Sequence, residues 1–233
     1  MAVPKQKTKA TNAKKTTGGG GAGGAGNTDQ SAALVAASPT AMKSSARKNI
    51  PIIYKECIKN GVKDPGQIAY VIATAEHESH LGKMMMERQW VKDEAANNKY
   101  FTERYGSRKD LGNIEPADGP RFTGRGFCQI TGRVNYTYWS KKLGIDLINN
   151  PDLAAKDISV AARILVVGMR DGTFTKRHKL ADHIGGGKRD FDNARRIINA
   201  VEDKKNPKNH AEKQKAMKAI SAAANRYYNA LVG

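Results

Sequence analysis

Aromatic residues and proline are scarce in this chain. Phe, Trp and Tyr together make up 6% of its 233 residues, and there are eight prolines. So few aromatic side chains argue against an aromatic-rich β fold, and frequent alanine favours helices. The chain is long enough for one domain with a sizeable core.

Cysteines and long apolar runs are also few. The two cysteines, Cys57 and Cys128, do not have the spacing of a metal site, which favours two reduced thiols in the core. A disulfide between them is the alternative. No stretch reaches the roughly 18 apolar residues of a membrane span. Residues 1–26 carry lysines without the apolar run of an export signal. We therefore expect synthesis in a host cytoplasm without a signal peptide.

Acidic residues are outnumbered, because 40 Lys and Arg face 22 Asp and Glu, for a formal net charge of +18. A field of this sign attracts polyanions such as nucleic acid or the anionic polymers of a bacterial envelope. A nucleic-acid binder would need a basic stripe with interleaved aromatics or a known module. The sequence shows neither, so we do not expect nucleic acid as a partner.

The start of the chain has low complexity. Five lysines between positions 5 and 15 precede a glycine-rich run at residues 18–26. This composition buries too little apolar surface to offset chain entropy. The sequence predicts a disordered, basic, Gly-rich tail over residues 1–38 and a catalytic domain over residues 39–233. The tail is either a plain linker or a tether to an anionic envelope or a larger particle.

Helical signals dominate the rest of the chain. Asp64 is a predicted N-cap with Pro65 at the first helical position, and Gly82 is the predicted stop. Other helices are expected at residues 50–60, 100–105, 131–144, 158–169, 191–201 and 211–231, with a short extended piece at 127–130. The predicted fold is mainly α.

Polar residues crowd the end of the helix that follows Asp64. His77 and His80 flank Glu78, but they are three residues apart, whereas zinc proteases space two histidines four apart. No third ligand follows, so we predict no metal site. Glycoside hydrolysis instead needs two carboxyl groups that face the scissile bond. Glu78 suits the proton donor, since the negative end of a helix and partial burial both disfavour its charged form.

The second carboxylate is expected from the segment beyond Gly82. Glu87, nine residues after Glu78, is the first choice, and Glu94, Glu103 and Asp110 are alternatives.

Residues 121–136 form a second notable run. Its glycines permit close backbone approach. Gln129 and Asn135 carry amides that both donate and accept hydrogen bonds, as sugar hydroxyls and N-acetyl groups require. The run lacks the context of a dinucleotide site or a phosphate loop, so we predict no nucleotide cofactor.

Residues 124–136, Gly-Arg-Gly-Phe-Cys-Gln-Ile-Thr-Gly-Arg-Val-Asn-Tyr, closely resemble the signature of glycoside hydrolase family 19. His77-Glu78-Ser79 resembles the segment with the family's catalytic acid, Glu87 matches the second carboxylate of phage-type members, and residues 194–199 resemble a downstream Arg-Arg-Ile-Ile-Asn motif. The resemblance implies a lysozyme-like, two-lobed helical domain and an inverting mechanism without a cofactor. Glu78 would protonate the glycosidic oxygen and Glu87 would activate water. The implied sugar-binding residues are Gln129, Asn135 and Asn199, and Arg196 would neighbour the acid or its support network.

Three positions depart from the family pattern. Gln89 stands where phage-type members often have Thr or Ser, Ala200 replaces a glycine, and Cys128 replaces an aliphatic residue. The leading hypothesis is a peptidoglycan hydrolase that acts as a phage endolysin or as part of a phage-like particle. A chitinase of the same family and an inactive glycan-binding or structural derivative are the alternatives.

Overall fold

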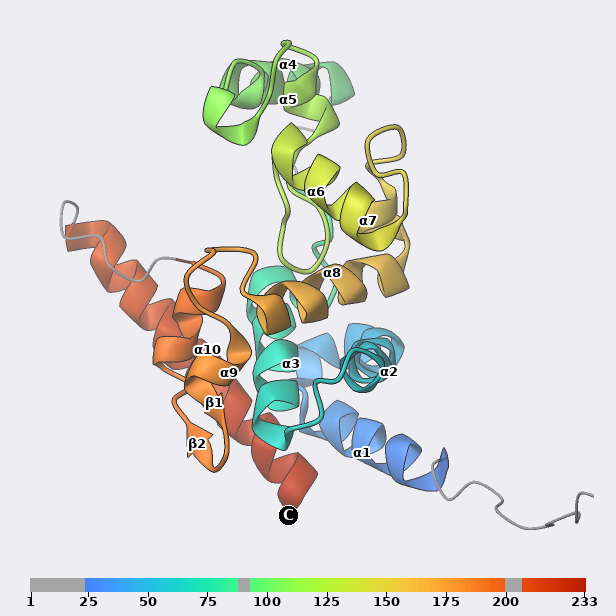
Figure 1. Cartoon of the computed structure of the whole chain (residues 1–233), viewed down its shortest axis with the longest axis vertical. Coiled ribbons are helices and arrows are strands. Elements are labelled where there is room, and N and C mark those ends of the chain that lie inside the picture. Colours follow the sequence, from blue (N-terminus) through green and yellow to red (C-terminus); the bar gives the residue numbers. More distant parts are fainter. Residues whose placement is uncertain (1–23, 88–92, 200–206) are drawn as a thin grey trace, which may run out of the picture.

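Helices account for most of the computed structural model, which describes residues 24–87, 93–199 and 207–233 (Figure 1). The α-helices are α1 (Gly24–Ala37), α2 (Lys43–Lys59), α3 (Pro65–Ser79), α4 (Glu94–Tyr105), α5 (Asp118–Arg121), α6 (Arg133–Leu143), α7 (Leu153–Lys156), α8 (Ile158–Asp171), α9 (Leu180–His183) and α10 (Pro207–Val232). Three 3-10 helices are η1 (Thr40–Met42), η2 (Lys109–Leu111) and η3 (Asn193–Ile197). Within the described ranges, the named strands are β1 (Ile184–Gly185) and β2 (Lys188–Arg189), which pair antiparallel. The mainly α fold predicted from the sequence is confirmed.

The structure has two lobes, each with its own apolar core. In Figure 1 the upper lobe contains α4 to α7 and the lower lobe contains α1, α2, α3, α9 and α10, with α8 between them. Helix α8 contributes to both cores: Leu165 and Met169 lie in the lower core, whereas Ile164 and Val167 lie in the upper core. Because each pair is three or four residues apart, α8 has two apolar faces. It is therefore the shared wall that joins the lobes.

Helix α3 is the most deeply buried helix segment of the lower lobe. Its start agrees with the prediction, since the Asp64 side chain accepts a hydrogen bond from the Gln67 backbone N–H at 3.0 Å and Pro65 occupies the first turn. Its residues from Ile68 to Ala75 are all buried. The helix ends at Ser79, because His80 adopts a left-handed conformation with φ of 51°. This ending places Glu78 on the last turn of a helix that packing holds in place.

The folded region begins earlier than the sequence predicts. Helix α1 occupies residues that the prediction assigned to the tail, and its Leu34 is fully buried in the lower core. The Lys43 ammonium group donates to the carbonyl oxygens of Val35, Ala36 and Ser38 at 2.8–3.0 Å, which satisfies the exposed end of α1. The predicted tail boundary at residue 38 is therefore wrong. Residues 1–23 of that tail lie outside the described residues.

The region around residue 195 also differs from the prediction. A helix was expected at residues 191–201, but the structure has the short η3. The Asp190 carboxylate accepts hydrogen bonds from both the backbone and the side chain of Asn193, which favours a tight local turn over a regular helix. The predicted helix at 211–231 is confirmed as part of α10, which begins at Pro207. No described helix is long and apolar enough to cross a membrane.

The burial of Leu34 leads to a stability prediction. We expect Leu34→Ala to lower the free energy of unfolding by about 2–5 kcal/mol, because it leaves a cavity in the lower core. Urea denaturation followed by circular dichroism measures the change. Ile114→Ala is the matched control, since Ile114 is 81% exposed and its truncation should have little effect. Equal stability of the two variants would show that α1 does not pack on the lobe.

Candidate active site

The first candidate carboxylate, Glu78, forms an ion pair with Arg195. Glu78 lies at the end of α3 and Arg195 lies on η3, so the pair joins segments 117 positions apart. The Glu78 side chain is 21% exposed and the Arg195 side chain 9% exposed. The guanidinium group contacts Oε1 of Glu78, and the Glu78 side chain forms no other hydrogen bond with the described residues. A guanidinium group favours the charged form of a carboxyl group, an effect that the sequence-based argument did not include.

The structure corrects the arginine that accompanies the acid. The sequence predicts Arg196 beside Glu78 or its support network, and the structure places the preceding residue, Arg195, at Glu78 itself. Successive residues of a 3-10 helix point about 120° apart, so only one of two adjacent arginines can face Glu78. The backbone carbonyl of Arg196 instead accepts a hydrogen bond from the Thr175 hydroxyl at 3.1 Å. The sequence indicated the Arg195-Arg196 pair but could not show which of the two side chains points toward Glu78.

The second candidate, Glu87, is held by two neutral donors. Its Oε1 accepts a hydrogen bond from the Tyr105 hydroxyl at 2.8 Å, and its Oε2 accepts one from the Gly124 backbone N–H at 3.2 Å. The Glu87 backbone N–H also donates to the Gly124 carbonyl at 2.8 Å. A Cβ atom at position 124 would lie 3.1 Å from Oε2 of Glu87, so the approach requires glycine. Burial comes first among the causes that raise the pKa of Tyr105, and its hydrogen bond to Glu87 adds to the effect.

The signature segment runs between the two carboxylates. Gly124 contacts Glu87, and Cys128, four residues later, is close enough to Glu78 for that charge to help raise the pKa of its thiol, after burial as the larger cause. The chain folds back between these points, because Arg125 pairs with Ile130 in an isolated β-bridge. The extended piece predicted at residues 127–130 is therefore wrong, because residues 126–129 form a turn in which Gln129 has a φ of 52°. Both cysteines are free thiols.

The three candidate sugar-binding amides are placed differently. Gln129 is half-buried, and its Nε2 donates to the carbonyl oxygens of Gly126 at 2.8 Å and Met84 at 3.3 Å. Asn135 is exposed, and its Nδ2 donates to the Thr131 carbonyl at 2.7 Å. Asn199 is exposed at the end of the described segment. Gln129 and Asn135 thus keep their amide oxygens available, whereas their NH₂ groups bond the backbone.

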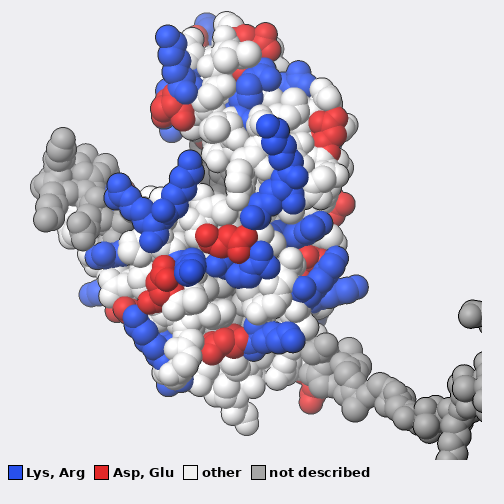
Figure 2. Space-filling view, in the orientation of Figure 1, with Lys and Arg blue, Asp and Glu red and all other residues white. Residues whose placement is uncertain are grey.

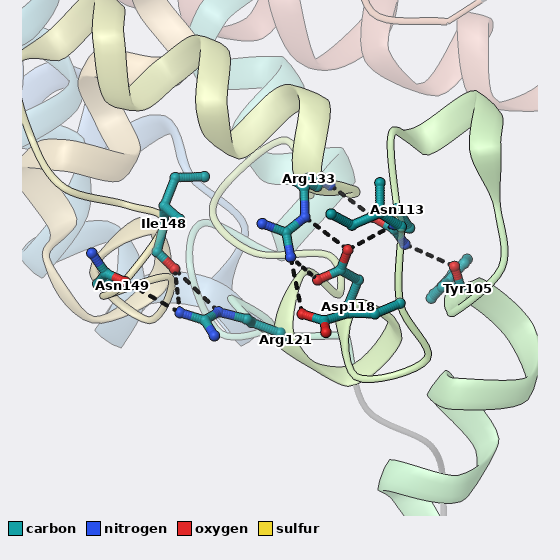
Figure 3. Close-up of polar contacts among 9 residues, drawn as sticks. Tyr105, Asn113, Asp118, Arg121, Arg133, Ile148 and Asn149 are labelled. Carbon is teal, nitrogen blue, oxygen red and sulfur yellow. Dashed lines mark hydrogen bonds and ion pairs between the residues drawn. The ribbon is translucent and has the colours of Figure 1, made fainter.

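Both arginines of the signature have structural roles. Arg125 is buried, with hydrogen bonds to the carbonyls of Arg121 and Thr123, to the Tyr136 hydroxyl and to the Asp152 carboxylate. Arg133 pairs with the fully buried Asp118 at the start of α6 (Figure 3). Much of the signature therefore builds the scaffold behind the site.

Figure 3 shows how this scaffold is tied together. The Asp118 carboxylate also accepts a hydrogen bond from the Ile114 backbone N–H at 2.9 Å, and Asn113 links the Arg133 backbone to the Tyr105 carbonyl. Because the Tyr105 side chain bonds Glu87, the network supports the wall on which the second carboxylate rests. Sequence reasoning missed Tyr105, whose partner lies 18 residues away.

The alternative second carboxylates have other environments. Asp110 forms an ion pair with Arg108, Glu103 is exposed on α4, and Glu94 begins α4. No described group of three or more His, Cys, Asp and Glu side chains is arranged to hold a metal ion. Gln89 and Ala200, two of the departures from the family pattern, lie outside the described residues.

Comparisons with known proteins match part of the chain to one family. The family model described as class I chitinase, glycoside hydrolase family 19, matches residues 65–170, which include both carboxylates and the signature segment. Chitinase 11 of Oryza sativa subsp. japonica is 43% identical over 56 residues, which cover 24% of this chain and 22% of that protein. The acidic 27 kDa endochitinase of Solanum lycopersicum is 33% identical over 92 residues, covering 32% and 37%. The match to the glycoside hydrolase family 19 model covers residues 65–170 of the chain.

The matched regions are short. The chain spans less than half the length of each of these plant chitinases. Among solved structures, chitinase C from Streptomyces griseus has a TM-score of 0.49 at 17% sequence identity, covering 89% of this chain and 79% of that one.

The buried Asp118 leads to a pH-dependent stability prediction. Burial opposes ionisation of Asp118, but hydrogen bonds from Arg133 and the Ile114 N–H outweigh it, so the pKa of Asp118 is lowered. A lowered folded-state pKa adds stability above the unfolded value of about 3.9, and this stability is lost as the pH falls through the folded-state pKa. We expect Asp118→Asn to cost about 1–3 kcal/mol at pH 7 and progressively less below about pH 4.

Urea denaturation of both proteins between pH 7 and pH 3 measures the difference. Asp110→Asn is the control, because it removes an exposed partner of an arginine and should leave stability unchanged at every pH. A difference for Asp118→Asn that stayed constant with pH would contradict an ionised Asp118.

Proposed function

We propose that the chain is a glycosidase that cleaves β-1,4 bonds of an N-acetylated glycan and that its substrate is bacterial peptidoglycan. The observation that supports the proposal is that both carboxylates lie near one segment, since Glu87 accepts a hydrogen bond from Gly124 and the Glu78 charge acts on the Cys128 thiol. Each carboxylate comes from a different element, and each is oriented by its own partners.

The partners of Glu87 suit a general base. Two neutral donors stabilise its carboxylate form without neutralising the charge, which leaves it able to accept a proton from water. An inverting glycosidase places such a base roughly 6.5–9.5 Å from the acid, so that a water molecule fits beside the sugar.

The environment of Glu78 suits a general acid. Arg195 contacts only Oε1, so Oε2 is available to the glycosidic oxygen. When Glu78 gives up its proton, the guanidinium group stabilises the carboxylate that forms, and this assistance is greatest as the bond breaks.

The amide groups give the site its sugar-binding capacity. The NH₂ groups of Gln129 and Asn135 donate to backbone carbonyls, which leaves their amide oxygens as the acceptors for sugar hydroxyl and N-acetyl N–H groups. Asn199 and Arg196 remain candidates for contacts further along the glycan.

The charge of the chain supports peptidoglycan as the substrate. Basic side chains are spread over both lobes on the face in Figure 2, and the net charge is +18. Such a surface is attracted to an anionic bacterial wall, whereas chitin is neutral. In this proposal the protein is an endolysin or part of a phage-like particle, made in the host cytoplasm and delivered to the wall by a separate route. Residues 1–23 would serve as the tether. The names of the plant relatives favour the alternative, a chitinase.

Substitution of the two carboxylates tests the mechanism. We expect Glu78→Gln and Glu87→Gln each to lower the hydrolysis rate by about 10²–10⁴-fold with the fold intact, because each removes one proton-transfer group. Release of reducing ends from purified peptidoglycan and from a soluble chitin derivative measures the rate, and circular dichroism monitors folding. Glu103→Gln is the control, since Glu103 is exposed on α4.

Three results would contradict the proposal. Full activity of Glu78→Gln would favour a glycan-binding role, and faster cleavage of chitin by the unmodified protein would favour the chitinase alternative. Mass spectrometry of the products should show sugars with one added water at the new reducing end. Anhydro sugars would indicate a lytic transglycosylase.

A further inference from the structure

A cavity of about 510 Å³ lies between α6 and the connection from α8 to α9. One wall is formed by Asn135, Tyr138 and Trp139 of α6, and the other by residues 171–174 and 176–179 together with Asp182. The sequence analysis assigned no role to residues 171–179.

The cavity adjoins the candidate active site on both walls. Asn135, a candidate sugar-binding residue, lines one side of it. On the other side, the Thr175 hydroxyl donates to the Arg196 carbonyl at 3.1 Å, and the preceding residue, Arg195, holds Glu78. A glycan bound at Asn135 would therefore extend past the loop of residues 172–179.

This loop is held firmly against α8 and α6. The Phe174 ring packs on Gly168, where an added Cβ would lie 2.2 Å from the ring, and its centroid is 6.1 Å from that of Trp139. The Thr173 backbone N–H donates to the Gly168 carbonyl at 3.0 Å, and that of Lys176 donates to Gly172 at 2.9 Å. The loop thus presents its outward side chains from a fixed backbone.

Those outward side chains are basic and have no acidic partner. Lys176, Arg177 and Lys179 are exposed, and none forms an ion pair with a described residue. Of the two acids that line the cavity, Asp171 forms ion pairs with Arg170 and Lys142, whereas Asp182 accepts a hydrogen bond from the neutral Lys179 backbone N–H. The cavity therefore offers three cations against the single unpaired carboxylate of Asp182, beside the 40% exposed Tyr138.

We propose that this cavity is a subsite for a carboxylate carried by the glycan at a sugar next to the cleavage site. The inference rests on the proposed function and makes it more specific. A planar guanidinium such as Arg177 pairs well with a carboxylate, and Tyr138 offers a face for a sugar ring. In peptidoglycan this carboxylate is either the lactyl group of a muramyl residue or an acid of its stem peptide, and chitin carries neither.

A triple substitution tests the subsite. Lys176→Gln/Arg177→Gln/Lys179→Gln removes the three cations from the cavity. The matched control is Arg47→Gln/Lys48→Gln/Lys55→Gln, which removes one arginine and two lysines from exposed positions of α2 that have no ion pair with a described residue. Both variants have the same net charge. Any difference in their activity therefore depends on where the cations lie and not on the overall attraction to the wall.

Activity is compared on three substrates, namely intact peptidoglycan, glycan strands from which an amidase has removed the stem peptides, and a neutral chito-oligosaccharide. We expect the cavity variant to lose about tenfold in kcat/KM on intact peptidoglycan and nothing on the neutral substrate. A loss also on the stripped strands would identify the lactyl carboxylate, and a loss on intact wall alone would identify the stem peptide. An equal loss on all three substrates, or an equal loss by the control variant, would overturn the subsite.

A binding measurement separates this inference from the proposed function. Calorimetry in the Glu78→Gln background measures the affinity for a soluble disaccharide peptide, and the cavity substitutions should weaken it about tenfold. If the unmodified protein cleaves no glycan while the cavity still binds the carboxylate, the glycosidase proposal fails and the subsite remains. If the unmodified protein cleaves the glycan but the cavity substitutions leave the affinity for the disaccharide peptide unchanged, only the subsite proposal fails.

Discussion

The two-sided burial of α8 is the constraint on which the structure depends. One face of this helix completes the lower core and the other completes the upper core, so neither lobe can bury its apolar surface without it. The signature segment repeats this arrangement on a small scale, because Phe127 enters the lower core and Ile130 the upper core. The geometry between the lobes is therefore set by packing, and the candidate site lies along that boundary.

Packing of a helix positions one carboxylate of the site, and hydrogen bonds position the other. Glu78 extends from the last turn of the buried α3 and is oriented by Arg195. Glu87 lies outside any regular helix and depends on Tyr105 and Gly124 for its position. The two environments differ, since Glu78 has a cationic partner whereas Glu87 has neutral donors. The network around Asp118 supports the second environment from behind.

The basic cavity extends the same boundary in the direction of α9. Its rigid loop and its excess of cations are features that a neutral polysaccharide would not require. The cavity therefore gives part of the chain's strong positive charge a defined position on the surface. Charge spread over a whole protein affects only the encounter with a polyanion, whereas three cations on a fixed loop can select a substrate.

Local signals in the sequence were sufficient to predict the helices with clear caps and to propose Glu78 and Glu87 as the carboxylates. Asp64 and Pro65 start α3 as predicted, because capping involves neighbours within one turn, and Glu78 and Glu87 stand in motifs specific to the family. Local signals did not reveal that α1 is folded, since the burial of Leu34 depends on partners far along the chain. Only the tertiary structure decided that Arg195 faces Glu78, that Tyr105 holds Glu87, and that residues 176–179 line a cavity. Each of these depends on helical phase and on contacts between distant segments, which a linear pattern does not encode.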